Sequence, residues 1–478
     1  ARLLIILALG LAVITLPSFF ERLHSDEVIY WEVARNISRG LGPYTETSGG
    51  GLFVWHMPLP FYIVAPFLGL SDHIFTARVI SSFFTIACAV LIFLIAAKKG
   101  ARDSALVSAI LFLLSFQALR FGGRYYLDQY GACFFLLSFY LAGKGRFAWA
   151  GASAALAILA REYWLGVYPF LTLYAAGLAG TGADRGRDVS KGFKNMFFFV
   201  MPVLILLAVT SAIVVFSDSS VYGHIKAYVL NGAAYKNLKA TDTPGYIQRI
   251  TRGWVEFTLI NILIVSGFLA SVKRESRILL LVIPQLVIIS LVQGFVVSGG
   301  VTQYPVALLA TVSPYSGAGL KRFYDLFLAP SGNRAGFLKA SLAVSCAQFI
   351  AFNLISTVVT LHKNTFVWGL GYSDDRKVIS ILRKEARGES INGFWGAFVD
   401  DRRSWDWTDF HLDRAIETDP DWLVTYENYI DILPQKDSAT PLEIYNIGPY
   451  VMIHSPQKGL LKEVVRQKHH PRWALRED

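Results

Sequence analysis

The chain has 478 residues, of which 54% are hydrophobic and only 17% are charged, and its mean hydropathy is +0.43. A soluble protein of this length needs a larger polar and charged shell, so the composition excludes an ordinary soluble domain. The formal net charge of +10 would favour a nucleic-acid partner in a soluble chain. Here the positions of the basic residues explain it instead, and we expect no nucleic-acid partner.

Apolar blocks of membrane-spanning length follow one another from the N-terminus. A helix of about 20 apolar residues crosses the hydrocarbon core, and only a helix satisfies the backbone groups there without water. The first block is expected to be a span rather than a cleaved signal peptide, because no small-residue cleavage site follows it. We predict an all-α polytopic membrane protein with about eleven transmembrane helices. They cover residues 2–20, 73–97, 103–121, 127–143, 147–162, 163–181, 195–216, 254–272, 278–298, 304–320 and 336–361.

Positive charge gathers in five alternate short loops between these spans, which marks the cytoplasmic side. The basic residues are Lys98, Lys99, Arg102, Lys144, Arg146, Arg185, Arg187, Lys191, Lys194, Lys273, Arg274, Arg277, Lys321, Arg322, Arg334 and Lys339. The loops 21–58 and 217–253 then lie outside, in what we expect to be the cytoplasmic membrane of a prokaryote. Residues 59–70 are apolar but too short to cross, and are predicted to be a re-entrant or interfacial segment.

The chain changes character after His362, where charges become dense and no further span follows. A helix-like run at 376–386 and strand-like runs at 422–426 and 450–454 predict a small external α/β domain. We therefore predict a transmembrane domain at 1–361 and an extracytoplasmic domain at 362–478.

The first outer loop carries an acidic pair at the start of a short amphipathic helix. Ser25 is a good N-cap, and Asp26 and Glu27 fall in the first turn, ahead of a helical apolar stripe. These acids could simply complement the helix dipole, which would stabilise the helix by about 0.3–1 kcal/mol. They could also serve catalysis, and the loop alone leaves the two interpretations open.

The residues after this helix add a pattern. Tyr30 begins a Tyr-x-x-x-Ala-Arg stretch, and residues 49–60 read Gly-Gly-Gly-Leu-Phe-Val-Trp-His-Met-Pro-Leu-Pro. The ordered set of acidic pair, helix, glycine-rich turn and His56-x-Pro-Leu-Pro resembles the GT-C superfamily. These membrane glycosyltransferases use sugars linked to polyprenyl phosphate, as protein O-mannosyltransferases and the aminoarabinose transferase of lipid A do. The resemblance is clearest over the N-terminal third, and it implies that Asp26 is the base or organiser for the acceptor, with Glu27 beside it.

Further charged residues fall at predicted outer ends of spans, where they are costly unless paired or functional. Arg124 and Asp128 resemble the Arg-x-x-x-Asp stretch at the start of the family's fourth span, and Arg161 and Glu162 resemble its Arg-Glu before the sixth. They could bind the departing phosphate or form interhelical salt bridges, and these roles are compatible. A basic outer loop containing Lys226 could contact lipid headgroups or gate the site. Tyr304 resembles part of the family's Arg-Tyr-x-x-Pro stretch, but Gln303 replaces the Arg, which puts a phosphate contact there in doubt.

The resemblance implies transfer of a sugar, with inversion, from polyprenyl phosphate to an acceptor protein, lipid or glycan on the external side. Asp26 would take the acceptor's proton and cationic groups would stabilise the leaving phosphate. No cofactor is expected to be required, although His24 and His56 leave a divalent metal possible. The alternatives are a transporter or flippase, a non-catalytic scaffold, and an oligosaccharyltransferase that uses a lipid pyrophosphate.

Overall fold

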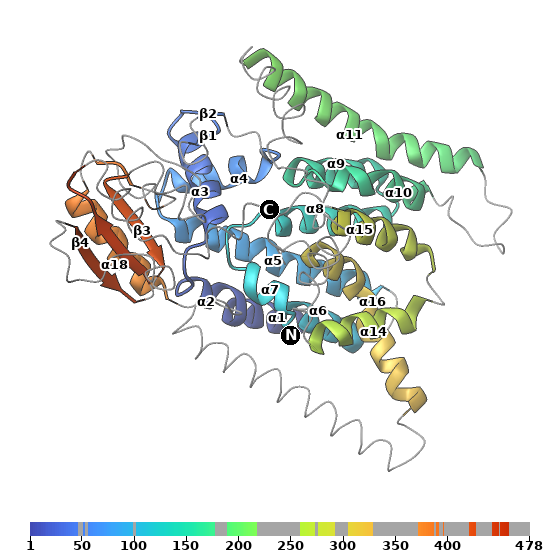
Figure 1. Ribbon diagram of the computed structural model, residues 1–478. Coiled ribbons are helices and arrows are strands. Elements are labelled where there is room, and N and C mark those ends of the chain that lie inside the picture. The colour runs from blue at the N-terminus through green and yellow to red at the C-terminus, as the bar shows by residue number, and fades with distance from the viewer. Residues whose placement is uncertain are drawn as a thin grey trace, which may run out of the picture. The chain divides into compact units, whose positions relative to one another are not determined.

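A computed structural model describes residues 1–45, 51–52, 56–98, 102–176, 189–217, 259–272, 276–291, 305–327, 371–386, 389–391, 395, 420–426, 442–448 and 450–457. The chain divides into two compact units (Figure 1). The helical unit comprises Ala1–Phe19 and Val54–Leu354, and the second unit comprises Phe20–Phe53 and Ile355–Asp478. The predicted boundary at 361/362 falls outside the described residues and stays a prediction.

The helical unit begins with an almost continuous helix and a long buried one. α1 (Arg2–Gly10), a π-helical segment η1 (Leu11–Thr15) and α2 (Leu16–Ser18) cover the first predicted span. α4 (Leu59–Leu68) occupies the segment that is too short to cross, and α5 (Ile74–Ala97) matches the next predicted span closely. The apolar lengths in the sequence account for these limits.

The predicted span 103–121 is not one helix. α6 (Arg102–Leu113) ends before Ser115, and α7 (Phe116–Phe121) begins after it. Ser115 has an extended backbone, and its hydroxyl accepts a 3.4 Å hydrogen bond from the amide of Ala118. A serine at this position caps the second helix, which explains a break that hydropathy alone does not show.

The remaining helices of this unit lie close to their predicted spans. They are α8 (Asp128–Ala142), α9 (Phe147–Ala160), α10 (Trp164–Ala176), α11 (Val189–Ser217), α14 (Leu259–Val272), a 3₁₀ turn η2 (Ser276–Ile278), α15 (Leu279–Leu291) and α16 (Pro305–Phe327). α14 and α16 cross at Gly267 and Gly319, where a Cβ on either residue would meet backbone. Such small-residue crossings are typical of helices packed in membranes.

Two helices among the described residues are long and apolar enough to cross a membrane, Ile74–Ala97 and Gly192–Val209. Shorter apolar helices accompany them, and the predicted span 336–361 lies outside the described residues. The number of spans therefore stays a prediction. The chain is nonetheless an integral membrane protein, because its composition leaves too little polar surface to cover a soluble core.

The second unit combines helices with a small sheet. α3 (Ser25–Ser38) precedes a two-residue hairpin of β1 (Tyr44–Thr45) and β2 (Gly51–Leu52). Far along the chain, α18 (Tyr372–Glu385) lies beside an antiparallel sheet of β3 (Trp422–Tyr426), β4 (Glu443–Ile447) and β5 (Tyr450–His454), in the order β3-β5-β4 (Figure 1). Both predicted strands are confirmed, and β4 was not predicted.

Candidate active site

A buried ion pair joins two helices of the helical unit. Asp128 is the first residue of α8, and Arg161 directly follows α9 with an extended backbone that ends the helix. Arg161 Nε donates a 3.2 Å hydrogen bond to Asp128 Oδ1, and each side chain is only 1% exposed. Removing two charges from water is costly, so each depends on the other. An interhelical salt bridge, one of the two roles left open for these charges, is therefore present between Asp128 and Arg161.

His56 and Glu162 extend this pair toward solvent. His56 Nδ1 lies 2.9 Å from Glu162 Oε1, and Arg161 Nη1 lies 2.7 Å from the same ring nitrogen and 3.1 Å from Nε2. The His56 side chain is 18% exposed and that of Glu162 is 44% exposed. Arg161 is almost fully covered, so it can act on a ligand chiefly through these two neighbours.

The protonation of His56 sets the charge of this cluster. A contact with Arg161 requires an unprotonated ring nitrogen as acceptor, whereas a contact with Glu162 requires a ring N–H as donor. Asp128, Arg161 and Glu162 together carry two negative charges and one positive charge. A protonated His56 makes the cluster neutral and presents a cation at its accessible edge, where an anion such as a phosphate can bind.

Close packing holds Arg161 in this position. A Cβ at Gly131 of α8 would lie 2.5 Å from Trp164 Nε1 and 3.2 Å from Arg161 Cβ. The Trp164 ring also stacks on Phe135 of α8, with ring centroids 4.2 Å apart. Glycine is therefore the residue that lets the segment after α9 approach α8 closely enough for the ion pair.

Arg124 is 5% exposed and lies in the turn between α7 and α8. Its carbonyl accepts a 2.8 Å hydrogen bond from Gln129 Nε2, and the neighbouring Tyr125 hydroxyl donates to the Pro60 carbonyl at 3.1 Å. These bonds tie the turn to the start of α4, four residues after His56. The structure thus brings His56, Asp128, Arg161 and Glu162 into contact, and places Arg124 on the turn just before Asp128.

The acidic pair of the first outer loop lies in the second unit, on the first turn of α3. The helix begins at Ser25 with His24 as N-cap, so the prediction of Ser25 as N-cap is wrong by one residue. Asp26 is half-buried, whereas Glu27 is fully buried and Tyr30 is 4% exposed. Asp26 is therefore the acid of the pair that solvent and ligands can reach.

Hydrogen bonds brace α3 against the hairpin that follows it. Thr45 Oγ1 donates a 2.9 Å hydrogen bond to the buried Glu32, and Asn36 Nδ2 donates to the Tyr44 carbonyl at 2.7 Å. Buried polar groups held in this way fix the helix to the rest of its unit. The position of Asp26 therefore depends on the contacts of α3 with this hairpin.

Solved structures share this fold. No protein-family model and no curated protein sequence matches the chain. ArnT from Cupriavidus metallidurans bound to undecaprenyl phosphate matches with a TM-score of 0.57 and 11% identity, over 95% of this chain and 99% of ArnT. The Archaeoglobus fulgidus oligosaccharyltransferase tethered to an acceptor peptide matches with a TM-score of 0.55 and 11% identity, over 89% of this chain and 68% of that one. The chain has the GT-C fold. The resemblance inferred from the first outer loop is thus confirmed for the fold.

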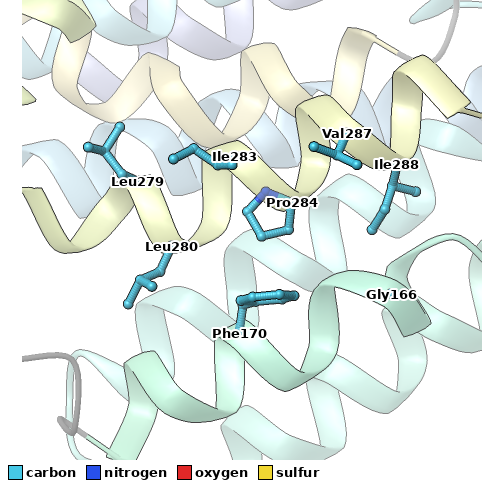
Figure 2. Close-up of a pocket in the computed structure, with 8 residues that line it drawn as sticks. All are labelled: Gly166, Phe170, Leu279, Leu280, Ile283, Pro284, Val287 and Ile288. Carbon is cyan, nitrogen blue, oxygen red and sulfur yellow. The ribbon is translucent and has the colours of Figure 1, made fainter.

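An apolar pocket of about 540 Å³ opens between α10 and α15 of this GT-C fold (Figure 2). Its lining residues are Gly166, Phe170, Leu279, Leu280, Ile283, Pro284, Val287 and Ile288. A Cβ at Gly166 would lie 2.6 Å from Ile288 Cδ1, so glycine leaves room there for the Ile288 side chain. Gly166 is five residues after Arg161, so the pocket and the charged cluster draw on neighbouring parts of the chain at the start of α10.

Two of the site residues predicted from the sequence lie outside the part of the chain that the structure describes. They are Lys226 and Tyr304. Within the described residues, no group of three or more His, Cys, Asp or Glu side chains could hold a metal ion, so the cofactor prediction stays a prediction. Among the buried charges that sequence reasoning missed is Arg78 of α5, which is fully buried and donates a 2.6 Å hydrogen bond to the Ser18 carbonyl. An arginine within an apolar block was its signal.

Proposed function

We propose that the chain transfers a sugar from a polyprenyl-phosphate carrier to an acceptor on the extracytoplasmic side of the membrane. The observation that carries this proposal is the shared fold, which extends over 95% of this chain and 99% of a protein solved with undecaprenyl phosphate. The charged cluster around His56 supports it, because it offers a partly exposed imidazole, a cation when protonated, at the end of apolar helices.

The chemistry is a single displacement with inversion. Asp26 accepts the proton of the acceptor hydroxyl or amine, and the acceptor atom forms a bond to C1 of the sugar. The bond between C1 and the phosphate oxygen breaks, and its electron pair leaves with the polyprenyl phosphate. A carboxylate suits the first role, since an unassisted hydroxyl is a weak nucleophile.

The leaving phosphate needs positive charge where its negative charge develops. We assign this role to His56 in its protonated form, held by Glu162. In this form both ring nitrogens are donors, so His56 gives up its contact with Arg161. Arg161 acts instead by linking the buried Asp128 to Glu162, the carboxylate that holds His56. Glu27 and Tyr30 are buried as well, so their part in the proposed reaction is to shape the first turns of α3.

The apolar pocket between α10 and α15 suits the isoprenoid chain of the donor. Its volume of about 540 Å³ is within the range of about 300–1,000 Å³ typical of small-molecule sites. Every lining residue is apolar, and Ile283 and Val287 are about half exposed at its rim. A chain that enters here runs along the same helix, α10, that begins three residues after Arg161.

The decisive experiment compares Asp26→Asn with Glu27→Gln in the full chain, purified and reconstituted in lipid. Transfer is followed from radiolabelled polyprenyl-phosphate sugars, and binding of undecaprenyl phosphate is measured separately. We expect Asp26→Asn to lower the transfer rate at least about a hundredfold while carrier binding is retained, since positioned proton transfer contributes roughly 10²–10⁴-fold. Full transfer by a folded Asp26→Asn variant would contradict the assignment.

An oligosaccharyltransferase is the second candidate, favoured by the match to the Archaeoglobus fulgidus enzyme. The same assay distinguishes the two when lipid-pyrophosphate oligosaccharides are offered beside lipid-monophosphate sugars. Transfer from the pyrophosphate donor alone would favour this second function. Movement of the lipid across the bilayer without transfer would favour a flippase.

A further inference from the structure

The segment that leads into α3 is held by residues from the far end of the chain. Leu23 donates its backbone N–H to Asp375 Oδ2 at 2.7 Å, across 352 residues of sequence. The amides of Gly371 and Tyr372 donate to the Phe20 carbonyl at 2.9 and 3.2 Å. The start of α18 is therefore bonded to both ends of the short stretch 20–23.

Asp375 is the centre of this arrangement. Its side chain is fully buried, and its second oxygen, Oδ1, accepts a 2.6 Å hydrogen bond from the hydroxyl of Tyr450 on β5. Both carboxylate oxygens are thus committed, one to a backbone amide and one to a phenol. A buried carboxylate is stable only with such donors, so its orientation is closely defined.

Arg22 adds a second connection to the same place. Its guanidinium lies 3.6 Å from Asp374 and 5.7 Å from the centroid of the Tyr450 ring. Gly371 has a φ of +150°, and a Cβ there would collide with Arg22. Residues 20–23, the N-terminus of α18 and β5 therefore form one packed and hydrogen-bonded joint.

We infer that Asp375 and Tyr450 are positioning residues for Asp26, an inference that rests on the proposed role of Asp26 as the base. Leu23 is three residues before Asp26, and the first backbone bond of α3 runs from Val28 N–H to the His24 carbonyl at 3.0 Å. Fixing Leu23 fixes His24, and through it the first turn that carries Asp26. A misplacement of about 1 Å in a reacting group can lower a rate about a hundredfold.

The test is Tyr450→Phe in the full reconstituted chain. Tyr445→Phe is the matched control, because Tyr445 lies on the neighbouring strand β4 and donates its hydroxyl to the exposed Glu443 at 3.1 Å. We expect kcat for sugar transfer to fall about tenfold in Tyr450→Phe, a barrier increase of about 1.4 kcal/mol, with KM for the lipid donor unchanged. Tyr445→Phe should leave both values unchanged.

Hydrogen exchange separates this inference from the proposed function. The amides of Leu23 and Val28 should exchange faster in Tyr450→Phe, while the amides of β3 and β5 keep their protection. Unchanged exchange at Leu23 and Val28 would overturn the inference, whether or not sugar transfer is detected. Faster exchange with an unchanged kcat would overturn it too, because the joint would then be purely structural. Loss of activity in Asp26→Asn alone tests the proposed function.

Discussion

Two buried aspartates, one in each unit, are stabilised in different ways. Asp375 in the second unit has a hydrogen-bond donor at each carboxylate oxygen, and both donors are uncharged. Asp128 in the helical unit has the guanidinium of Arg161 at Oδ1, whereas Oδ2 is buried without a hydrogen-bond partner among the described residues. The hydrogen bonds to Asp375 described above come from uncharged groups, whereas the hydrogen bond to Asp128 comes from a cation.

The difference indicates what each aspartate can do. The fully buried Asp375, with a donor at each oxygen, holds its neighbours in place and is out of reach of a ligand. A buried oxygen without a partner is uncommon in folded proteins and is often associated with a functional site. Asp128 thus keeps an acceptor oxygen without a partner among the described residues, as expected of a functional cluster, while Asp375 belongs to a hydrogen-bonded joint.

The largest expected effect comes from Arg161→Met, which leaves the Asp128 carboxylate buried without its charge partner. Breaking a buried ion pair in this way costs about 3–5 kcal/mol of stability. We expect a marked fall in the thermal unfolding midpoint of the detergent-purified protein, together with loss of sugar transfer. Tryptophan fluorescence during heating measures the first effect.

The control for this variant is the double change Arg161→Met with Asp128→Leu. Replacing a buried ion pair by apolar residues of similar size is often neutral, so the double variant should recover most of the lost stability. Its transfer activity should stay low, because Arg161 would no longer link α8 to Glu162, the residue that holds His56. A double variant no more stable than the single one would contradict the charge-based account of Asp128.

A smaller effect is expected from Asp375→Asn, which tests the hydrogen-bonded aspartate. The amide has one oxygen for two donors, so either the Leu23 N–H or the Tyr450 hydroxyl loses its acceptor. A buried donor without an acceptor costs about 1–3 kcal/mol. Hydrogen exchange at the Leu23 amide measures this cost as a loss of protection.

Asp374→Asn is the matched control, since this neighbour on α18 is partly exposed and its ion pairs, with Arg22 at 3.6 Å and with Lys377 at 3.8 Å, are long. Its effect on Leu23 exchange should be within about 0–1 kcal/mol, as for other partly exposed pairs. If the two substitutions changed exchange at Leu23 equally, the buried hydrogen bonds of Asp375 would protect this amide no more than the ion pair of Asp374 does.

The sequence predicted local features of this architecture better than distant contacts. Spans, the strands β3 and β5 and the helix after His24 follow from apolar length and periodicity, which neighbouring residues determine. The pairing of Asp128 with Arg161 could have been predicted from the sequence, because both charges were expected at outer ends of adjacent spans. The bond between Leu23 and Asp375 could not, since no periodic pattern links residues 352 positions apart. The strand β4 was missed because Glu443 and Asn446 interrupt its apolar alternation.

The smallest effect on stability is expected from Glu162→Gln, which changes the exposed member of the charged cluster. Its side chain is 44% exposed, and partly exposed ion pairs contribute only about 0–1 kcal/mol. Activity should respond more strongly, because a neutral amide favours the protonated form of His56 less than a carboxylate does. We therefore expect sugar transfer to fall at high pH and to recover as the pH is lowered and His56 becomes protonated.

Asp103→Asn, which removes the exposed ion pair with Arg2, is the control and should leave this pH profile unchanged. A Glu162→Gln profile that matches the wild type at every pH would show that Glu162 does not support His56. The buried pair of Asp128 and Arg161 and the partly exposed Glu162 would then differ only in how much each contributes to stability.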